Sequence, residues 1–441
     1  MNQKNLFLTY VSIVSFFLWG PVHSAVSDGP GGSIDVVVDV GANSNTPEAA
    51  FGAAFQYILC PGGQFAQLCG DIFSVDPTQT ADVYRQLSAR SVTAMTSLLS
   101  QGSLVMAMED FSARLAALRR AARKHSTASL DQRGPQRRAL FALLDKGRGG
   151  AAGDDAPRPS VFVSDALIRS NQDETATLAG FDSDLYGVTI GMDYRLDAQT
   201  IAGFATRLLG GETQLDYNDG GLVSRDVNLT YYGSYFPGQD FYLEGSIQAG
   251  RGMYELVRRI NFNLPNVSAH ESARGNTRGS QIGFALGAGY EHYLSAIETT
   301  ALVTAKYRYN NASLDSYTET GSSYSLNVSS QDIRSQTLSL GGQLSSAFSY
   351  AGGVILPQLN LVWKHEFDTT GQDIGAGFVA DPNGTTFVFR SDERDSDYLE
   401  LSLGVSHLQV SGMTAFLQYT RLQGYSNYTQ SMWSLGLRAE F

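Results

Sequence analysis

The sequence predicts an all-β protein, a 12-stranded antiparallel outer-membrane β-barrel preceded by a short, mostly helical N-terminal region and a luminal helix and linker. Two observations lead to this fold class. After residue 160 the side chains alternate between apolar and polar with a period of two, which is typical of half-buried strands. The connections between these segments are alternately long and short, which is typical of outer-membrane barrels. Because lipid cannot satisfy open sheet edges, the sheet has to close.

The alternation is clear in the segment "PQLNLVWKHEF" (357–367). Leu361 and Trp363 lie on one face of the expected strand, and Lys364 and Glu366 lie on the other. An apolar outer face and a polar inner face are what a barrel in lipid requires. The same alternation predicts five polar side chains that line the lumen or its rim: Lys306, Arg308, Lys364, Glu366 and Glu400.

Twelve segments of this kind follow one another along the chain. They span residues 160–170, 183–195, 198–210, 222–236, 239–252, 278–292, 296–310, 332–348, 353–367, 396–409, 412–422 and 431–441. An even number of strands places both ends of the barrel on the side with the short turns, which is the periplasmic side. The last segment, "SMWSLGLRAEF", is therefore expected to close the barrel against the first.

The N-terminus predicts an export signal over residues 1–24. Lys4 supplies a positive charge, residues 6–20 are apolar, and small residues precede a cleavage site after Ser24. This pattern implies the general secretory export machinery as a partner. A retained membrane anchor is the alternative, but the apolar stretch is shorter than the ~20 residues that a spanning helix needs.

Residues 25–75 form a short passenger-like region. They contain one strand-like run at 34–40 and both cysteines of the chain, Cys60 and Cys69. Exported proteins meet an oxidising compartment, so a small disulfide loop between the two cysteines is expected. A metal site would need further His or Cys residues close by, and the neighbouring sequence has none.

Residues 76–159 are expected to form a helical tail and a linker. Asp76 and Pro77 suit the N-cap and first position of a helix that continues to Gly102, where it ends. A second, increasingly basic helix follows. The composition of residues 146–159 indicates a linker.

Charge is unevenly distributed along the chain. Residues 114–148 carry a net charge of +8, whereas residues 160–441 carry −13. The basic segment is either a solvated helix and linker or a segment received inside the acidic barrel. The overall net charge of −12 argues against a nucleic-acid partner, because nucleic-acid-binding proteins have basic surfaces.

Residues 160–441 resemble the autotransporter β-domain, the translocator barrel of type V secretion. The most distinctive motifs are "GMDYRL", "WKHEF" and the closing "GLRAEF". The resemblance implies a monomeric barrel in the outer membrane of a Gram-negative bacterium, in contact with lipid, that carries a passenger to the cell surface. It also implies that the barrel-assembly machinery recognises the C-terminal pattern formed by Trp433, Leu435, Leu437 and Phe441.

The N-terminal region departs from this family in its size. Only about 130 residues separate the signal from the barrel, whereas large members carry passengers of several hundred residues. Members with an esterase passenger have a Gly-Asp-Ser-Leu block, but here "GDIF" has Ile72 where the serine would stand. The sequence therefore predicts a protein that is not an enzyme, with no catalytic, cofactor-binding or metal-binding residues and no cofactor.

Three functions fit these features. The first is a translocator barrel that moves its own short passenger to the cell surface. The second is a surface adhesin or interaction protein that binds through the passenger and the long loops. The third is a porin-like channel whose N-terminal helices stay in the periplasm.

Overall fold

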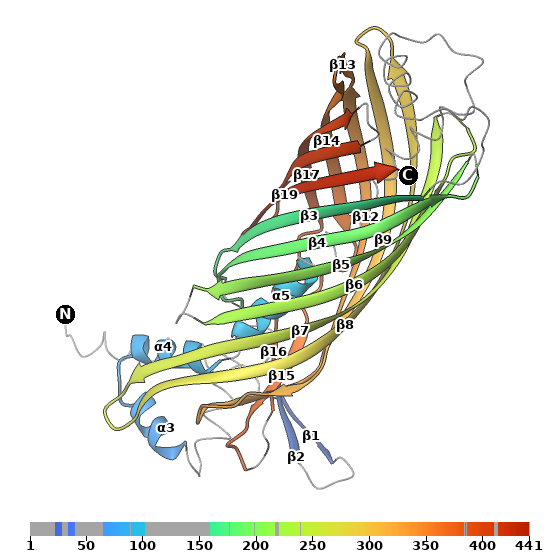
Figure 1. The fold of residues 1–441 in the computed structure, drawn as a ribbon. Coiled ribbons are helices and arrows are strands. Elements are labelled where there is room, and N and C mark those ends of the chain that lie inside the picture. The colour runs from blue at the N-terminus through green and yellow to red at the C-terminus, as the bar shows by residue number, and fades with distance from the viewer. Residues whose placement is uncertain are drawn as a thin grey trace, which may run out of the picture.

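The structure is a computed structural model that describes residues 23–28, 34–39, 65–88, 90–101, 159–175, 177–197, 199–216, 220–238, 240–382, 384, 386–409 and 413–440. These residues form a β-barrel, a smaller sheet at one end of it, and three helices near that same end (Figure 1). The predicted basic segment 114–148, Phe441 and most of the predicted signal peptide lie outside the described residues.

The barrel has twelve antiparallel strands, as the sequence predicts. They are β3 (Pro159–Gln172), β4 (Phe181–Arg195), β5 (Thr200–Leu215), β6 (Gly221–Tyr235), β7 (Phe241–Asn263), β8 (Ser268–Leu294), β9 (Thr299–Leu314), β12 (Gln331–Ser346), β14 (Gly353–Glu366), β17 (Asp397–Gln409), β18 (Met413–Gln423) and β19 (Tyr428–Glu440). The last strand closes the barrel on the first, from the pair Tyr428↔Gln172 to the pair Glu440↔Ser160. The predicted closure of the barrel by its C-terminal segment is confirmed.

The connections after β3, β9 and β14 are long, as the sequence predicts, whereas those after β7 and β18, on the same side of the barrel, are tight turns. Short turns follow β4, β6, β8 and β17, and the turn after β12 carries the three-residue strand β13 (Phe348–Tyr350). We call this side of the barrel the short-turn end and the opposite side the long-loop end. The barrel begins at Pro159 and finishes at Glu440, both at the short-turn end (Figure 1).

The prediction of a long loop over residues 257–276 is wrong. Strands β7 and β8 continue through this region and pair as far as Asn263↔Ser268, so that only a tight turn joins them. The hairpin projects beyond the other strands at the long-loop end (Figure 1). The extension is stable as a hairpin because its inner face stays buried, with Leu256 and Ile260 at 2% and 0% exposure.

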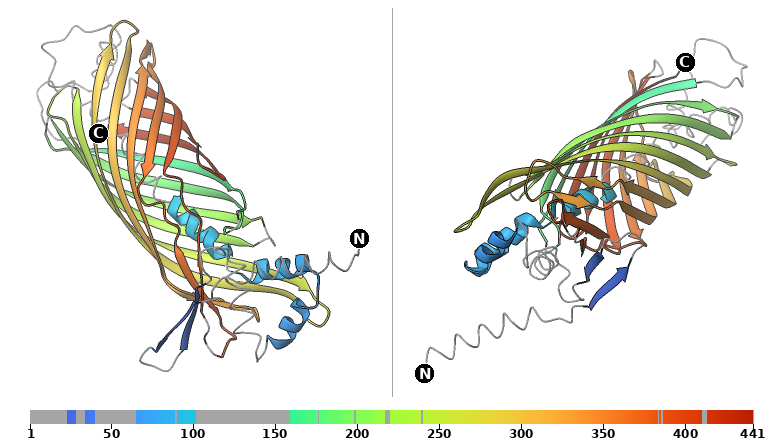
Figure 2. Two further views of the ribbon diagram at one scale, coloured as in Figure 1. Left: turned by 180° about the vertical axis from the view of Figure 1, so that it is seen from behind. Right: turned by 90° about the horizontal axis from the view of Figure 1, so that it is seen from below.

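Two further segments expected to be loops, 311–331 and 368–395, contain short strands. These strands are β10 (Tyr317–Thr318), β11 (Leu326–Val328), β15 (Asp373–Phe378) and β16 (Phe387–Arg390). Together with β1 (His23–Asp28) and β2 (Ile34–Asp39), they form a six-stranded sheet in the order β1-β2-β16-β15-β11-β10. Strand β2 matches the predicted strand-like run 34–40. This small sheet lies at the long-loop end (Figure 2).

Three helices precede the barrel: α3 (Ala66–Ile72), α4 (Pro77–Leu87) and α5 (Arg90–Gln101). The predicted start of α4 is confirmed, since Asp76 is its N-cap and accepts a hydrogen bond from the backbone N–H of Thr78 at 2.9 Å. The prediction of one continuous helix up to Gly102 is wrong, because Ser88 adopts an extended conformation and separates α4 from α5. No described helix has the length and hydropathy needed to cross a membrane.

In the middle of the barrel, the outer face of the wall is apolar and the inner face is polar. Outward-facing apolar side chains are widely exposed, for example Ile247 at 62% and Val303 at 65%. Inward-facing polar side chains such as Asn228 and Thr230 are buried. An apolar outer band with a polar interior is the arrangement of a barrel that sits in lipid.

Candidate functional site

Two of the predicted luminal residues form an ion pair inside the barrel. The Lys364 ammonium contacts a carboxylate oxygen of Glu400, and both side chains are buried. Lys306 makes its ion pair with Glu244 instead, with 3.1 Å between Nζ and Oε1. Glu244 lies on β7, and nothing local in the sequence pointed to this pairing. Arg308 is also buried, at 3% exposure.

Glu366 lies at the end of β14 and joins it to β12. Its carboxylate accepts hydrogen bonds from Ser335 Oγ at 2.6 Å and from the Gln336 backbone N–H at 2.8 Å. It also accepts one from the backbone N–H of Asp368 at 3.1 Å. The contacts of Glu366 therefore fix the rim at the long-loop end, and its role as a luminal residue stays a prediction.

The predicted C-terminal signal lies on the outer wall of β19. Trp433, Leu435 and Leu437 are each about half exposed. The ring centroid of Trp433 is 4.8 Å from that of Tyr419 on the neighbouring strand. Phe441 lies outside the described residues, and recognition of this pattern by the assembly machinery stays a prediction.

The apolar face of the wall changes sides at the long-loop end. Along β7, Phe241, Leu243 and Ile247 point outward, but further along Leu256 and Ile260 point inward and are buried. A wall that has left the hydrocarbon faces water on its outer side, so its apolar side chains are stabilised only on the inner side. This change of side therefore marks the limit of the lipid. It also leaves apolar side chains lining the inside of the long-loop end, which we call the mouth of the barrel.

This lining forms one buried hydrophobic cluster with the helices and the small sheet. The cluster joins helix residues, hairpin residues and loop-sheet residues, including Leu68, Ile72, Val83, Leu87, Val92, Met95, Leu256, Ile260, Phe262, Leu326, Val328, Ile374 and Phe378. The ring of Phe65 lies 5.2 Å from that of Phe378. We call the helices α3–α5 together with the small sheet the cap.

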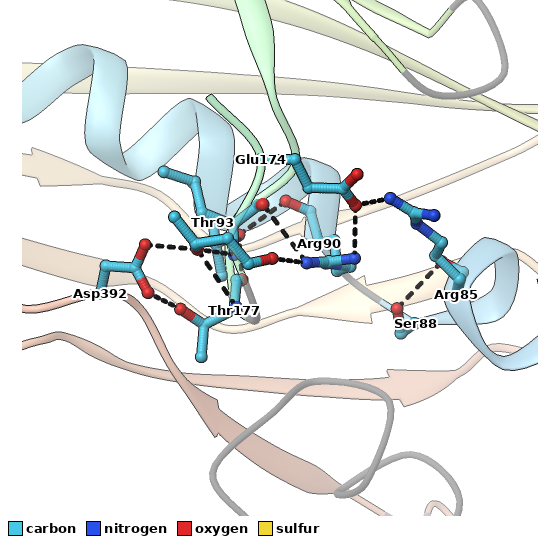
Figure 3. A network of polar contacts seen from close by, with 9 residues as sticks. Arg85, Ser88, Arg90, Thr93, Glu174, Thr177 and Asp392 are labelled. Carbon is cyan, nitrogen blue, oxygen red and sulfur yellow. Dashed lines mark hydrogen bonds and ion pairs between the residues drawn. The ribbon is translucent and has the colours of Figure 1, made fainter. Parts of the chain in front are cut away.

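A polar network fastens α5 to the loop between β3 and β4 (Figure 3). The guanidinium of Arg90 donates to the Glu174 carboxylate at 2.8 Å. Thr93 Oγ1 donates to the backbone carbonyl of Thr177 at 2.9 Å. The hydroxyl of Thr177 in turn contacts Asp392, which lies in the connection between β14 and β17. The start of α5 is thus held by the loop between β3 and β4, which is itself hydrogen-bonded to the connection between β14 and β17.

Helix α4 contacts a buried ion pair on the extended hairpin. The Arg258 guanidinium donates to the Glu319 carboxylate at 2.6 Å, and these two side chains are 5% and 0% exposed. Arg258 also donates to the backbone carbonyls of Gln86 at 3.0 Å and Tyr324 at 2.7 Å. The side chain of Gln86 accepts from the Asn261 backbone N–H at 2.6 Å. One arginine therefore connects α4, the hairpin and the small sheet.

Helix α3 is attached to the tip of the same hairpin. The Asp71 carboxylate accepts hydrogen bonds from the backbone N–H of Asn266 at 2.7 Å and from its side-chain amide at 2.5 Å. Cys69 is buried in this helix. Its expected partner Cys60 lies outside the described residues, so the disulfide stays a prediction.

Two pKa values in the cap are shifted, one by burial and one by an ion pair. Burial raises the pKa of Tyr324 to about 12, so its phenol stays neutral. On the exposed side of the small sheet, hydrogen bonds from Arg390 lower the pKa of Asp373 below its ordinary value. The cap therefore keeps Asp373 ionised and Tyr324 protonated over the physiological range of pH.

A comparison with known protein families identifies the family of the barrel. Residues 166–420 match the model of the autotransporter β-domain. The chain belongs to the autotransporter β-domain family. It is accordingly a translocator barrel of the outer membrane of a Gram-negative bacterium, formed by a single chain that closes on itself. The long-loop end of such a barrel is its extracellular end.

Curated proteins and solved structures include relatives that are similar to this chain. Lipase 1 of Photorhabdus luminescens is 24% identical over 281 residues, which are 62% of this chain and 41% of that protein. Outer membrane protein A of Rickettsia conorii is 25% identical over 242 residues, 52% of this chain and 12% of that protein. The chain thus spans less than half the length of either relative. The translocator domain of autotransporter NalP from Neisseria meningitidis has a TM-score of 0.50 at 16% identity, covering 69% of this chain and 94% of that one.

Proposed function

We propose that this chain carries its own N-terminal segment to the cell surface and keeps helices α3–α5 there as part of a cap. The observation that carries the proposal is the hydrophobic cluster that α3–α5 share with the extracellular mouth. Burial of apolar side chains is the main source of folding free energy, so helices that share a core with the loops stay attached to them. A passenger on a flexible linker would have no such core.

The basic segment before the barrel fits a place in the lumen. Helix α5 contacts the extracellular rim through Thr96 and Gln331, whereas β3 begins at the opposite end of the barrel. We propose that residues 102–158 run between these ends through the acidic barrel, attracted by its opposite charge. Cysteines at Ala139 and Leu140 that react fully from the periplasm would contradict this path.

We further propose that the displayed segment is not an enzyme. Ile72 occupies the position where related esterases carry their nucleophile, and it is 1% exposed within the cluster. The export machinery and the barrel-assembly machinery are the partners that this route requires, and Cys60 with Cys69 would form the disulfide after export.

Protease treatment of intact cells tests the display. We expect cleavage of the Glu319→Ala variant on intact cells to release a fragment that contains Cys60 and Cys69, identified by mass spectrometry, whereas the folded wild-type cap resists release because α3 is buried in the cluster. Protection that is lost only after the outer membrane is permeabilised would contradict display. The Glu319→Ala variant, whose cap is loosened, serves as the control. A folded cap on the cell surface becomes sensitive to protease in this variant, whereas a periplasmic cap stays protected.

A further inference from the structure

A groove of about 1010 Å³ lies on the outer wall of the barrel, centred on strands β3–β6, with residues of β7 and β8 at one edge and of β18 and β19 at the other. Its lining includes four glycines, Gly210, Gly211, Gly220 and Gly221. The outer wall is hollowed at Gly210, because this outward-facing residue has no side chain. A Cβ atom built on Gly210 would meet nothing closer than 3.8 Å, so the space above it is open.

The groove begins where the apolar outer surface stops. On β4 the outward-facing Ile190, Val188 and Tyr186 are exposed at 56%, 44% and 58%, and the next outward-facing residue is Asp184. On β6 the exposed Val227 is followed in the same way by Arg225. Aromatic girdles flank the apolar band of outer-membrane barrels, and Tyr186 has this position. The groove is therefore at the level of the outer-leaflet headgroups.

Charges of both signs line this groove, with one more arginine than carboxylates, although the chain as a whole is acidic. Five arginines line it: Arg169, Arg225, Arg259, Arg274 and Arg421. Four carboxylates lie among them: Asp182, Asp184, Glu212 and Glu255. Arg169 donates to Asp184 at 3.0 Å, so these two charges offset each other, and Asn171 donates to Asp182 at 2.9 Å. Arg225 is 3.9 Å from Glu255 and remains 72% exposed.

We propose that this groove binds the phosphorylated saccharide headgroup of an outer-leaflet glycolipid, with the acyl chains lying on the apolar wall below. Guanidinium groups bind phosphate through paired hydrogen bonds, which suits Arg225 on β6 and Arg274 on β8, both on the same side of the hollow. The glycine floor provides room for a sugar ring against the backbone. A divalent cation carried by the phosphates would be held by the carboxylates, since Mg²⁺ binds through carboxylates together with phosphate oxygens.

Binding of bisphosphorylated lipid A to the purified full-length protein in detergent, measured by native mass spectrometry, tests the proposal. Each basic residue near an anionic lipid surface contributes about 1 kcal/mol, a factor of about five in affinity. We expect Arg225→Gln combined with Arg274→Gln to weaken binding by roughly 25-fold. Arg390→Gln, which removes one positive charge from the exposed side of the cap, is the control for each single arginine variant and should leave binding unchanged. The heat-modified migration of each barrel on a gel verifies that it is folded.

Two comparisons identify the ligand. Dephosphorylated lipid A and phosphatidylethanolamine should bind much more weakly than the bisphosphorylated lipid, and inorganic phosphate should compete poorly because it has no acyl chains. Equal binding by the double variant and the wild type would overturn the proposal. Equal binding of the phosphorylated and dephosphorylated lipids would overturn it as well, because the arginines would then have no role.

Discussion

Removing Glu319 tests how the cap is held on the barrel. In the wild type, Glu319 and Arg258 are 0% and 5% exposed and lie 2.6 Å apart. Glu319→Ala leaves the guanidinium buried with two backbone carbonyls and no opposite charge. Breaking a buried ion pair at one partner destabilises by about 3–5 kcal/mol. If the cap opens as a unit, its open population rises by a factor between about a hundred and a few thousand.

Hydrogen exchange of the α4 backbone amides, followed by mass spectrometry on the purified protein, measures this opening. We expect exchange in α4 to accelerate by at least two orders of magnitude, while the middle of the barrel stays protected. Asp373→Ala is the matched control, because it breaks a cap ion pair whose side chains are 57% and 52% exposed. Exposed pairs contribute about 0–1 kcal/mol, so its effect should be slight. Equal exchange in both variants would refute the account of the Arg258 contact.

Three further predictions concern the barrel and the response to pH. Lys364→Met removes the positive charge beside the buried Glu400, and it should lower barrel stability by about 3–5 kcal/mol, seen as loss of heat-resistant gel migration at a lower temperature. Gly203→Ala would place a Cβ atom 2.6 Å from the ring of Tyr232. Overpacking of this kind should lower barrel stability by about 1–3 kcal/mol, measured in the same gel assay. The pKa of Asp373 is lowered by Arg390, so its contribution is present above the ordinary pKa of 3.8 and is lost as the pH falls through the lower folded value. After division by the intrinsic exchange rate at each pH, the protection of the cap amides should fall slightly over that acidic range, and Asp373→Asn should reduce this dependence on pH.

The barrel could be predicted because each of its strands carries a local signal, the alternation of apolar and polar side chains. Alternation in segments such as 357–367 determines which side chains face lipid, and loop lengths then give the orientation. The extension of β7 was missed although alternation continues there, because the apolar face changes sides between Met253 and Leu256. A search for apolar alternation of either phase would have found it.

Of the cap, only β2 and the start of α4 could be predicted from the sequence. The other strands of the small sheet are between two and six residues long, too short for a periodic pattern to distinguish them from loop. The contacts that define it join residues far apart in the chain, such as Arg258 with Gln86 and Asn266 with Asp71. Such pairs depend on the closure of the barrel and have no local signal. The pairing of Lys306 with Glu244 inside the lumen was missed for the same reason.

The central claim is that helices α3–α5 lie on the extracellular side of the membrane. Gln79 is exposed on α4, and Ser295 is exposed in the short turn after β8. Labelling of Gln79→Cys and Ser295→Cys in intact cells with a membrane-impermeant maleimide compares these two positions directly. We predict that Gln79→Cys reacts in intact cells and that Ser295→Cys reacts only after the outer membrane is permeabilised. Labelling of Ser295→Cys but not Gln79→Cys in intact cells would contradict the account.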